Sequence, residues 1–200
     1  MNIYDWPAAV RVRGFRPGLE GNSRSFESPF TGDEQVVDTL GSKWVFEVVI
    51  GQIKDLALAS RFSARLESVG GRKHCIKLYD FSRPRRAVLG TPVVNESLSM
   101  RRYLTSRGWT PSKLVLNEGD WLQIGNELKR VVSDVRSDAS GRATINLEPE
   151  LRATYASGTP LLVERPMGLF RIDDKQAGKG MITNKGADFG TIRFREALYP

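Results

Sequence analysis

Short stretches of alternating apolar and polar residues recur along this 200-residue chain, and only one stretch has helical spacing. Alternation with a period of two is typical of β-strands that bury one face. The clearest strand is predicted over residues 43–50, KWVFEVVI, where Trp44 and Phe46 share one face with Val48 and Ile50. Strands that recur every 8–12 residues indicate a sandwich or small barrel. We therefore expect a mainly β fold.

The exception lies over residues 53–69, where apolar residues that include Phe62 and Leu66 recur at the spacing of one helix face. Gly70 and Gly71 follow, and we expect them to end the helix because glycine adopts the left-handed conformation without strain. An amphipathic helix flanked by strands is most simply a helix that packs on a sheet. Binding at a membrane surface is a weaker interpretation because the apolar face carries no tryptophan.

The segment RPRR at residues 83–86 breaks the strand pattern, and Gly90, Pro92 and Asn95 extend this break. We predict two domains. Residues 1–85 with 167–200 form a β-sandwich with one packing α-helix, and residues 86–166 form an inserted small β-barrel, OB-like or galectin-like. Residues 175–190 are rich in glycine and lysine and predict a long loop between the last strands.

Inside the inserted domain, the stretch GDWLQIGNELKRVVSDV reads as a hairpin. Gly119 and Asp120 predict a turn into a strand, and Gly125 with Asn126 predicts a tight reversal. Trp121 shares a face with Gly125, opposite to the apolar residues between them. Trp121 and Trp109 could stack on bases or sugars, but for Trp121 a position in the core or at a subunit contact is favoured.

The net charge of +7 and the isoelectric point near 9.7 invite a nucleic-acid interpretation. The arginines are dispersed, however, and dispersed charge more often supports solubility or binds acidic neighbours. No apolar run of about 18 residues occurs, so no membrane insertion is expected. The first residues lack the pattern of a secretory signal, and the single cysteine cannot form an internal disulfide. Both features fit a reducing cytoplasm.

The inventory of reactive residues is poor. The only histidine, His74, precedes the only cysteine, Cys75, and neighbours on a strand point to opposite faces. They therefore cannot act as base and nucleophile. A serine triad would need the same histidine, and no G-x-S-x-G motif is present. We expect no enzymatic activity and no cofactor.

Metal and phosphate motifs are also weak. Asp134 and Asp138 lack the spacing of a calcium loop, and one cysteine with one histidine cannot form a structural zinc site. Asp173 and Asp174 are better explained as a polar strand end. The segment GKG at residues 178–180 misses the P-loop pattern. No metal site is predicted.

The serial order of several segments resembles the distal tail proteins of long-tailed, siphovirus-like bacteriophages and related tail-like particles. The resemblance covers almost the whole chain. It rests on YDWPAAVRV, NSRSFESPFTGDEQVVDTLGSKW, KLYDFSRPRR, RGWTP, LNEGDWLQIGNELKRVVSDVRSDASGRATINLEPELR, ERPMGLFRI and DFGTIRFREA. The stretch VVNESLSMRRYLTSRG departs from the more glycine-rich and less charged segment expected at that place.

The resemblance implies a virion structural protein of the tail tip or baseplate, assembled in the host bacterial cytoplasm. Such proteins form homohexameric rings between the tail tube protein and the hub, hold receptor-binding proteins, and leave a channel through which DNA passes. The family has no shared catalytic residues. We select these structural or assembly candidates: Trp44, Phe46, Phe62, Leu66, Trp109, Gly119, Asp120, Trp121, Gly125, Phe170 and Phe194.

Three alternatives remain open from the sequence. The protein could be another tail or hub subunit. It could be a basic small-barrel module that binds single-stranded nucleic acid through Trp121 and Tyr103, with strongly salt-dependent affinity. The inserted barrel, residues 86–165, could instead bind carbohydrate on a host surface.

Overall fold

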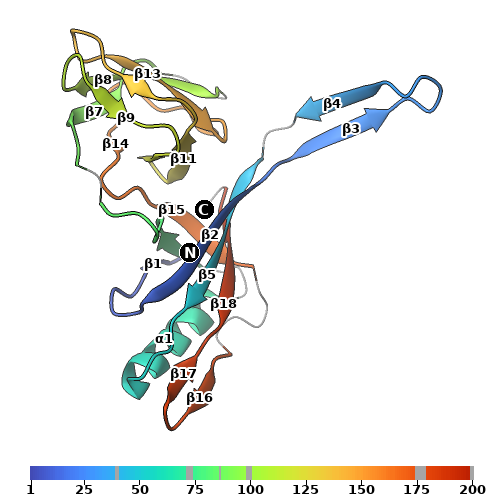
Figure 1. Cartoon of the computed structure of the whole chain (residues 1–200), viewed down its shortest axis with the longest axis vertical. Helices are drawn as coiled ribbons and strands as arrows, with labels where there is room; N and C mark the ends of the chain where they lie inside the picture. The colour runs from blue at the N-terminus through green and yellow to red at the C-terminus, as the bar shows by residue number, and fades with distance from the viewer. Residues whose placement is uncertain (39–40, 71–73, 86, 98–100, 174–178, 199–200) are drawn as a thin grey trace.

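In the computed structural model, strands dominate and a single helix is present in the parts described, which are residues 1–38, 41–70, 74–85, 87–97, 101–173 and 179–198. Two six-stranded sheets form two bodies, and a long hairpin arm projects from one of them (Figure 1). The prediction of a mainly β fold with one helix is confirmed.

The first sheet has the strand order β1-β6-β15-β18-β5-β2. Strand β5 lies between β18 and β2, as expected for its apolar sequence. The last strands of the chain pair back onto the first ones, because β18 runs antiparallel to β5. The bounds are β1 (Ile3–Asp5), β2 (Val12–Glu20), β5 (Lys43–Ile50), β6 (Cys75–Leu78), β15 (Gly168–Ile172) and β18 (Thr191–Glu196).

One face of the first sheet is covered by helix α1 (Leu56–Val69), which buries Phe62 and Leu66 against it. The helix begins three residues later than predicted, because Asp55 caps it by accepting hydrogen bonds from two backbone amides of the first turn. Ile53 instead forms a β-bridge with Ala187.

The helix ends before Gly70 as predicted, but by a different geometry. Gly70 has a φ of −57° and a ψ of 161°, so it is not in the left-handed conformation. Its amide donates to the carbonyls of Leu66 and Glu67. Gly71 lies outside the described residues.

The second sheet is a nearly closed barrel with the strand order β14-β10-β11-β13-β8-β7. Its ends approach each other, since the amide of Val94 donates to the carbonyl of Thr159 over 2.9 Å. The bounds are β7 (Gly90–Val94), β8 (Tyr103–Trp109), β10 (Trp121–Ile124), β11 (Glu127–Val131), β13 (Ala143–Glu148) and β14 (Leu161–Leu162).

Three two-stranded sheets complete the fold: β9 (Leu114–Leu116) with β12 (Val135–Arg136), β16 (Met181–Thr183) with β17 (Gly186–Asp188), and β3 (Ser23–Glu27) with β4 (Glu34–Asp38). The β16–β17 pair corrects part of the predicted 175–190 loop, of which residues 175–178 lie outside the described ranges. Trp109 is the last residue of strand β8, and strand β11 returns directly after the Gly125–Asn126 reversal.

The chain crosses between the two sheets twice. The first crossing lies between β6 and β7, and the second lies between β14 and β15. The predicted domain bounds, after residues 85 and 166, fall within these two crossings. The barrel core is built from residues 94–163, whereas the core of the first sheet also takes Trp121 and Leu128 from the barrel strands.

Candidate functional site

Trp121 begins a strand of the barrel, yet its side chain packs in the core of the first sheet. Its ring centroid lies 4.6 Å from that of Trp44 and 5.9 Å from that of Phe46, and Trp121 is 5% exposed. Leu122 and Ile124 point into the barrel core, so alternation along β10 directs Trp121 out of the barrel. Trp121 therefore joins the two bodies and offers no exposed stacking surface.

Most of the other candidates gather around this contact. Phe46 stacks on Phe170, with ring centroids 4.4 Å apart. Besides Trp121, the first core holds six of the sequence candidates: Trp44, Phe46, Phe62, Leu66, Phe170 and Phe194. Trp109 is separate from them and lies in the barrel core, where its indole nitrogen donates to Ser106 over 2.8 Å.

The glycine and aspartate candidates shape the turns at the ends of β10. Gly119 and Gly125 have positive φ angles of 83° and 54°. A Cβ atom at Gly125 would also lie 2.9 Å from the ring of Tyr155, so both the conformation and the space require glycine there. Asp120 pairs with Arg83 of the first crossing at 3.3 Å. This pair ties the turn of the barrel to the segment that leads into it.

The indole groups of the junction also donate hydrogen bonds across it. Trp121 Nε1 donates to a carboxylate oxygen of Asp80 over 2.8 Å. Trp44 Nε1 donates to the carbonyl of Leu128 over 2.9 Å. Burying an indole leaves its N–H without water, so these bonds make the packing of the two rings specific in orientation.

A buried ion pair adds a second tie between the bodies. The guanidinium of Arg152 lies 2.7 Å from Glu196 of β18, and the side chains are 4% and 1% exposed. Arg152 also donates to the carbonyl of Ser42, and Glu196 accepts the amide of Trp44. Removing one partner of such a buried pair leaves the other charge buried without compensation, and this strongly destabilises the folded protein.

Beside it, Lys129 and Glu127 form a pair whose side-chain atoms lie 2.5 Å apart. Burial lowers the pKa of the Lys129 ammonium group, and the charge of Glu127 offsets only part of that effect. Burial acts to raise the pKa of Glu127. The charge of Lys129 and hydrogen bonds from Lys129, Tyr155 and the Arg152 amide outweigh it, so the pKa lies below its usual value.

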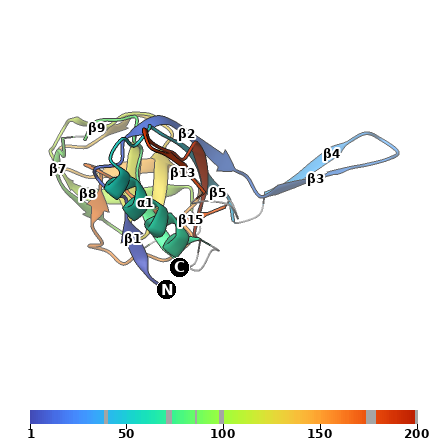
Figure 2. The same cartoon turned by 90° about the horizontal axis from the view of Figure 1, so that it is seen from below.

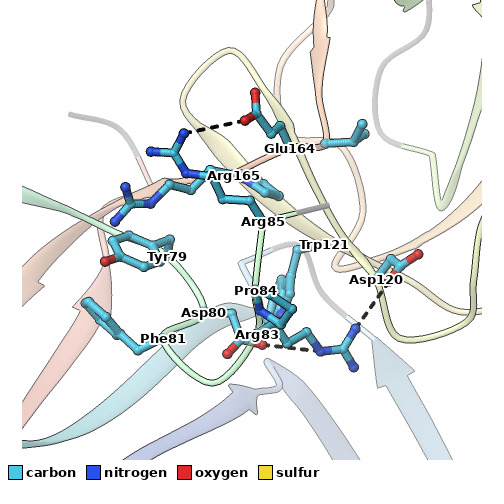
Figure 3. Close-up of a pocket in the computed structure, with 12 residues that line it drawn as sticks. Tyr79, Asp80, Phe81, Arg83, Pro84, Arg85, Asp120, Trp121, Glu164 and Arg165 are labelled. Carbon is cyan, nitrogen blue, oxygen red and sulfur yellow. Dashed lines mark hydrogen bonds and ion pairs between the residues drawn. The ribbon is translucent and has the colours of Figure 1, made fainter. Parts of the chain in front are cut away.

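The two crossings enclose a pocket of about 370 Å³ beside Trp121 (Figure 3). Its charged side chains largely satisfy each other, because Arg83 pairs with Asp80 and Arg85 reaches Glu164. The guanidinium of Arg165 lies 3.7 Å from the centroid of the Tyr79 ring. The pocket is thus bounded by paired charges and a covered aromatic ring, and it belongs to the junction.

The arm formed by β3 and β4 contrasts with this junction. It projects away from both bodies (Figure 2), and β3 and β4 pair only with each other. Phe30 at its tip is 95% exposed, Phe26 is 59% exposed, and Val36 is 60% exposed. No periodicity in the sequence indicates that this hairpin projects from the fold.

The reactive residues singled out in the sequence are not brought together. His74 accepts a hydrogen bond from the Asn2 amide, while Cys75 is buried with Leu169 and Ala197. Among the described residues, no three histidine, cysteine, aspartate or glutamate side chains gather as a metal site would require. The described part of the chain also holds no helix with the length and apolar character needed to cross a membrane.

Sequence reasoning missed the buried ion pairs. In β11, the alternation of Glu127 and Lys129 with Leu128 favours exposure of both charged residues, whereas all three are buried. Only the opposite charges of Glu127 and Lys129, two residues apart on one strand face, hint that they pair. No family model matches the chain, and no curated protein matches it significantly.

Proposed function

We propose that the protein is a structural subunit of a bacteriophage tail tip or baseplate. Copies of the chain associate into a hexameric ring that joins the tail tube to the central hub and receptor-binding parts. The ring leaves an axial channel for DNA, and the subunit performs no catalysis. The order of sequence segments described above supports the family, and the arm supports self-association.

The observation that carries the proposal is the arm with its exposed apolar side chains. An isolated two-stranded hairpin is marginally stable in water. Phe26, Phe30 and Val36 are exposed, and the two bodies of their own chain do not cover them because the arm points away from both bodies. Exposed apolar side chains on a projecting element are typical of protein contacts. A second copy is the partner that a homomeric ring supplies.

The junction supports the same function in another way. Closed rings need each copy to present two different surfaces at a fixed angle. Trp121 and the Arg152–Glu196 pair fix the barrel on the first sheet, so the angle between their outer surfaces is set within one copy. A subunit of this kind suits a ring that carries peripheral parts on its barrels.

The nucleic-acid alternative has lost part of its support. It relied on the net charge, Trp121 and Tyr103, and of these two rings Trp121 is buried while Tyr103 is exposed. Neither that alternative nor carbohydrate binding is favoured by a specific feature of the described residues. Single-stranded oligonucleotides should therefore show no tight, salt-dependent binding in a fluorescence anisotropy titration.

The test is the mass and shape of the purified protein. Mass photometry and negative-stain electron microscopy should reveal hollow rings of one stoichiometry, in equilibrium with monomers on dilution. A protein that remains monomeric at concentrations of about tens of micromolar, where weak protein contacts are populated, would overturn the proposal. A ring with another stoichiometry would retain self-association and correct the hexameric order.

A further inference from the structure

The arm and the rest of the chain carry opposite charge. Residues 23–38 contain one arginine and four acidic residues, a net charge of −3, although the whole chain carries +7. The acidic arm is therefore attracted to the basic remainder of another copy.

Two carboxylates stand side by side on the arm. Glu27 of β3 is the direct cross-strand partner of Glu34 of β4, so both side chains lie on the same face. Like charges directly opposite each other destabilise a hairpin. Neither Glu27 nor Glu34 forms an ion pair with any residue that the structure describes. This pair of carboxylates would be stabilised by a cationic partner.

A cross-strand pair of the opposite charge lies on the first sheet, on the face opposite to helix α1. Arg171 of β15 is the direct cross-strand partner of Arg195 of β18. The Nε atoms of both are buried and donate to no acceptor within the described residues. Glu20 and Asp173 partly neutralise Arg195 at 3.2 and 3.4 Å. Arg171 pairs with no carboxylate in the described ranges.

These arginines line a hollow of about 270 Å³ on the sheet, together with Lys43 of β5. Lys43, like Arg171, makes no ion pair with a described residue. Glu196 also borders the hollow, but its carboxylate is bound by Arg152 from the barrel side. We call the hollow formed by Lys43, Arg171, Asp173 and Arg195 the basic pocket.

The arm cannot fill the basic pocket of its own copy. The paired strands carry Glu27 and Glu34 to the distal part of the arm, which projects outward from the body that holds the pocket (Figures 1 and 2). The occupant must therefore come from outside the chain. The arm of a second copy supplies two neighbouring carboxylates, which match in number and in charge the two pocket cations, Lys43 and Arg171, that pair with no described carboxylate.

We propose that Glu27 and Glu34 on the arm of one copy bind the basic pocket of a second copy. The contact is heterologous, because arm and pocket lie in different places on the chain, and repetition around an axis closes a ring. This inference rests on the proposed self-association and deepens it by naming the two surfaces. The exposed phenyl rings of the arm then lie against the receiving copy.

Two neutralising variants separate the surfaces. Glu27→Gln with Glu34→Gln removes the arm carboxylates, and Lys43→Gln with Arg171→Gln neutralises two cations of the pocket. Each variant alone should self-associate at least about tenfold more weakly than the wild type, measured by sedimentation equilibrium. An equimolar mixture should form dimers and nothing larger, since each dimer uses the one intact arm and the one intact pocket.

A charge exchange within one chain provides a second measurement. Glu27→Arg with Glu34→Arg, combined with Lys43→Glu and Arg171→Glu, should restore the assembly that each half abolishes. Controls for net charge are Asp33→Asn at the tip of the arm and Arg61→Gln on the exposed face of helix α1. Both controls should assemble as the wild type does. Circular dichroism melting should show that every variant is folded.

The outcomes are distinguishable. If the wild type assembles and the Glu27→Gln, Glu34→Gln variant assembles equally well, the inference is overturned while self-association stands. If the mixture of the two variants yields no dimer, the pairing of arm with pocket is wrong. A wild type that stays monomeric overturns both this inference and the proposed function.

Discussion

The junction between the two bodies and the arm represent opposite uses of aromatic and charged residues. At the junction, Trp44 and Trp121 are buried and their N–H groups are bonded, and Arg152 meets Glu196 away from water. On the arm, Phe30 is exposed and Glu27 faces another glutamate. The junction satisfies its groups within one copy, whereas on the arm Phe30 is left exposed and neither Glu27 nor Glu34 forms an ion pair with a described residue.

This difference separates folding from assembly along the chain. Substitutions at the junction should alter the free energy of unfolding of a single copy. Substitutions on the arm should alter the association of copies and leave unfolding unchanged. The expected effects on unfolding can be ranked from the junction outward.

The largest effect is expected for Arg152→Ala. Removal of the guanidinium leaves Glu196 buried without its charge partner, and such losses cost about 3–5 kcal/mol. Urea unfolding followed by circular dichroism should show this decrease in the free energy of unfolding. The exposed Arg107→Ala serves as the control and should change it by less than about 0.5 kcal/mol. An equally small effect at Arg152 would show that the buried pair does not hold the bodies together.

A smaller loss is expected for Trp121→Phe. The phenyl ring keeps part of the contact with Trp44, but the hydrogen bond to Asp80 is lost and a small cavity forms. We expect a decrease of about 1–3 kcal/mol in the free energy of unfolding. Trp109→Phe is a matched control within the barrel core, and it should leave the contact between the bodies intact. Limited proteolysis at the two crossings should accelerate only for the Trp121 variant.

Acid should weaken the junction through Glu127. Its pKa in the folded protein lies below the ordinary value of 4.5, so the stability it contributes is complete above that value. That contribution is lost as the pH falls through the folded-state pKa. The free energy of unfolding, measured by urea titration between about pH 7 and pH 3, should therefore fall less steeply for Glu127→Gln than for the wild type. Glu96→Gln, at an exposed position, should follow the wild-type slope.

The smallest effect on unfolding is expected at the tip of the arm. Phe30→Ser replaces a side chain that is 95% exposed, so the free energy of unfolding should change by less than about 0.5 kcal/mol. The measurement is urea unfolding at a concentration where the wild type is monomeric. A loss of more than about 1 kcal/mol under these conditions would mean that the arm packs on its own chain. That result would contradict the contrast drawn between the junction and the arm.

Sequence patterns predicted the parts of the fold that depend on local periodicity. The alternation around Trp121 correctly placed it opposite to Leu122 and Ile124, and the Gly125–Asn126 reversal is confirmed. The spacing could not predict which residues cover Trp121, because those residues are distant from it in the sequence. A period of two describes one strand and carries no information on its neighbour across a junction.

The same limit explains the errors. The apolar Ile53 fits the helix face, but a bridge to Ala187 and the Asp55 cap exclude it from the helix. Lys129 is charged and yet fully buried, because its ammonium group finds Glu127 and the carbonyl of Glu150. The pairing of Arg171 with Arg195 likewise depends on strand register, which the sequence left open.

The most direct test compares the mass of the wild type with that of Phe26→Ser, Phe30→Ser at equal concentration. Mass photometry should give a ring for the wild type and a monomer for the variant, while the two share one urea unfolding curve under monomeric conditions. Rings of equal mass and stability from both proteins would contradict the account, because the exposed phenyl rings of the arm would then contribute nothing to assembly.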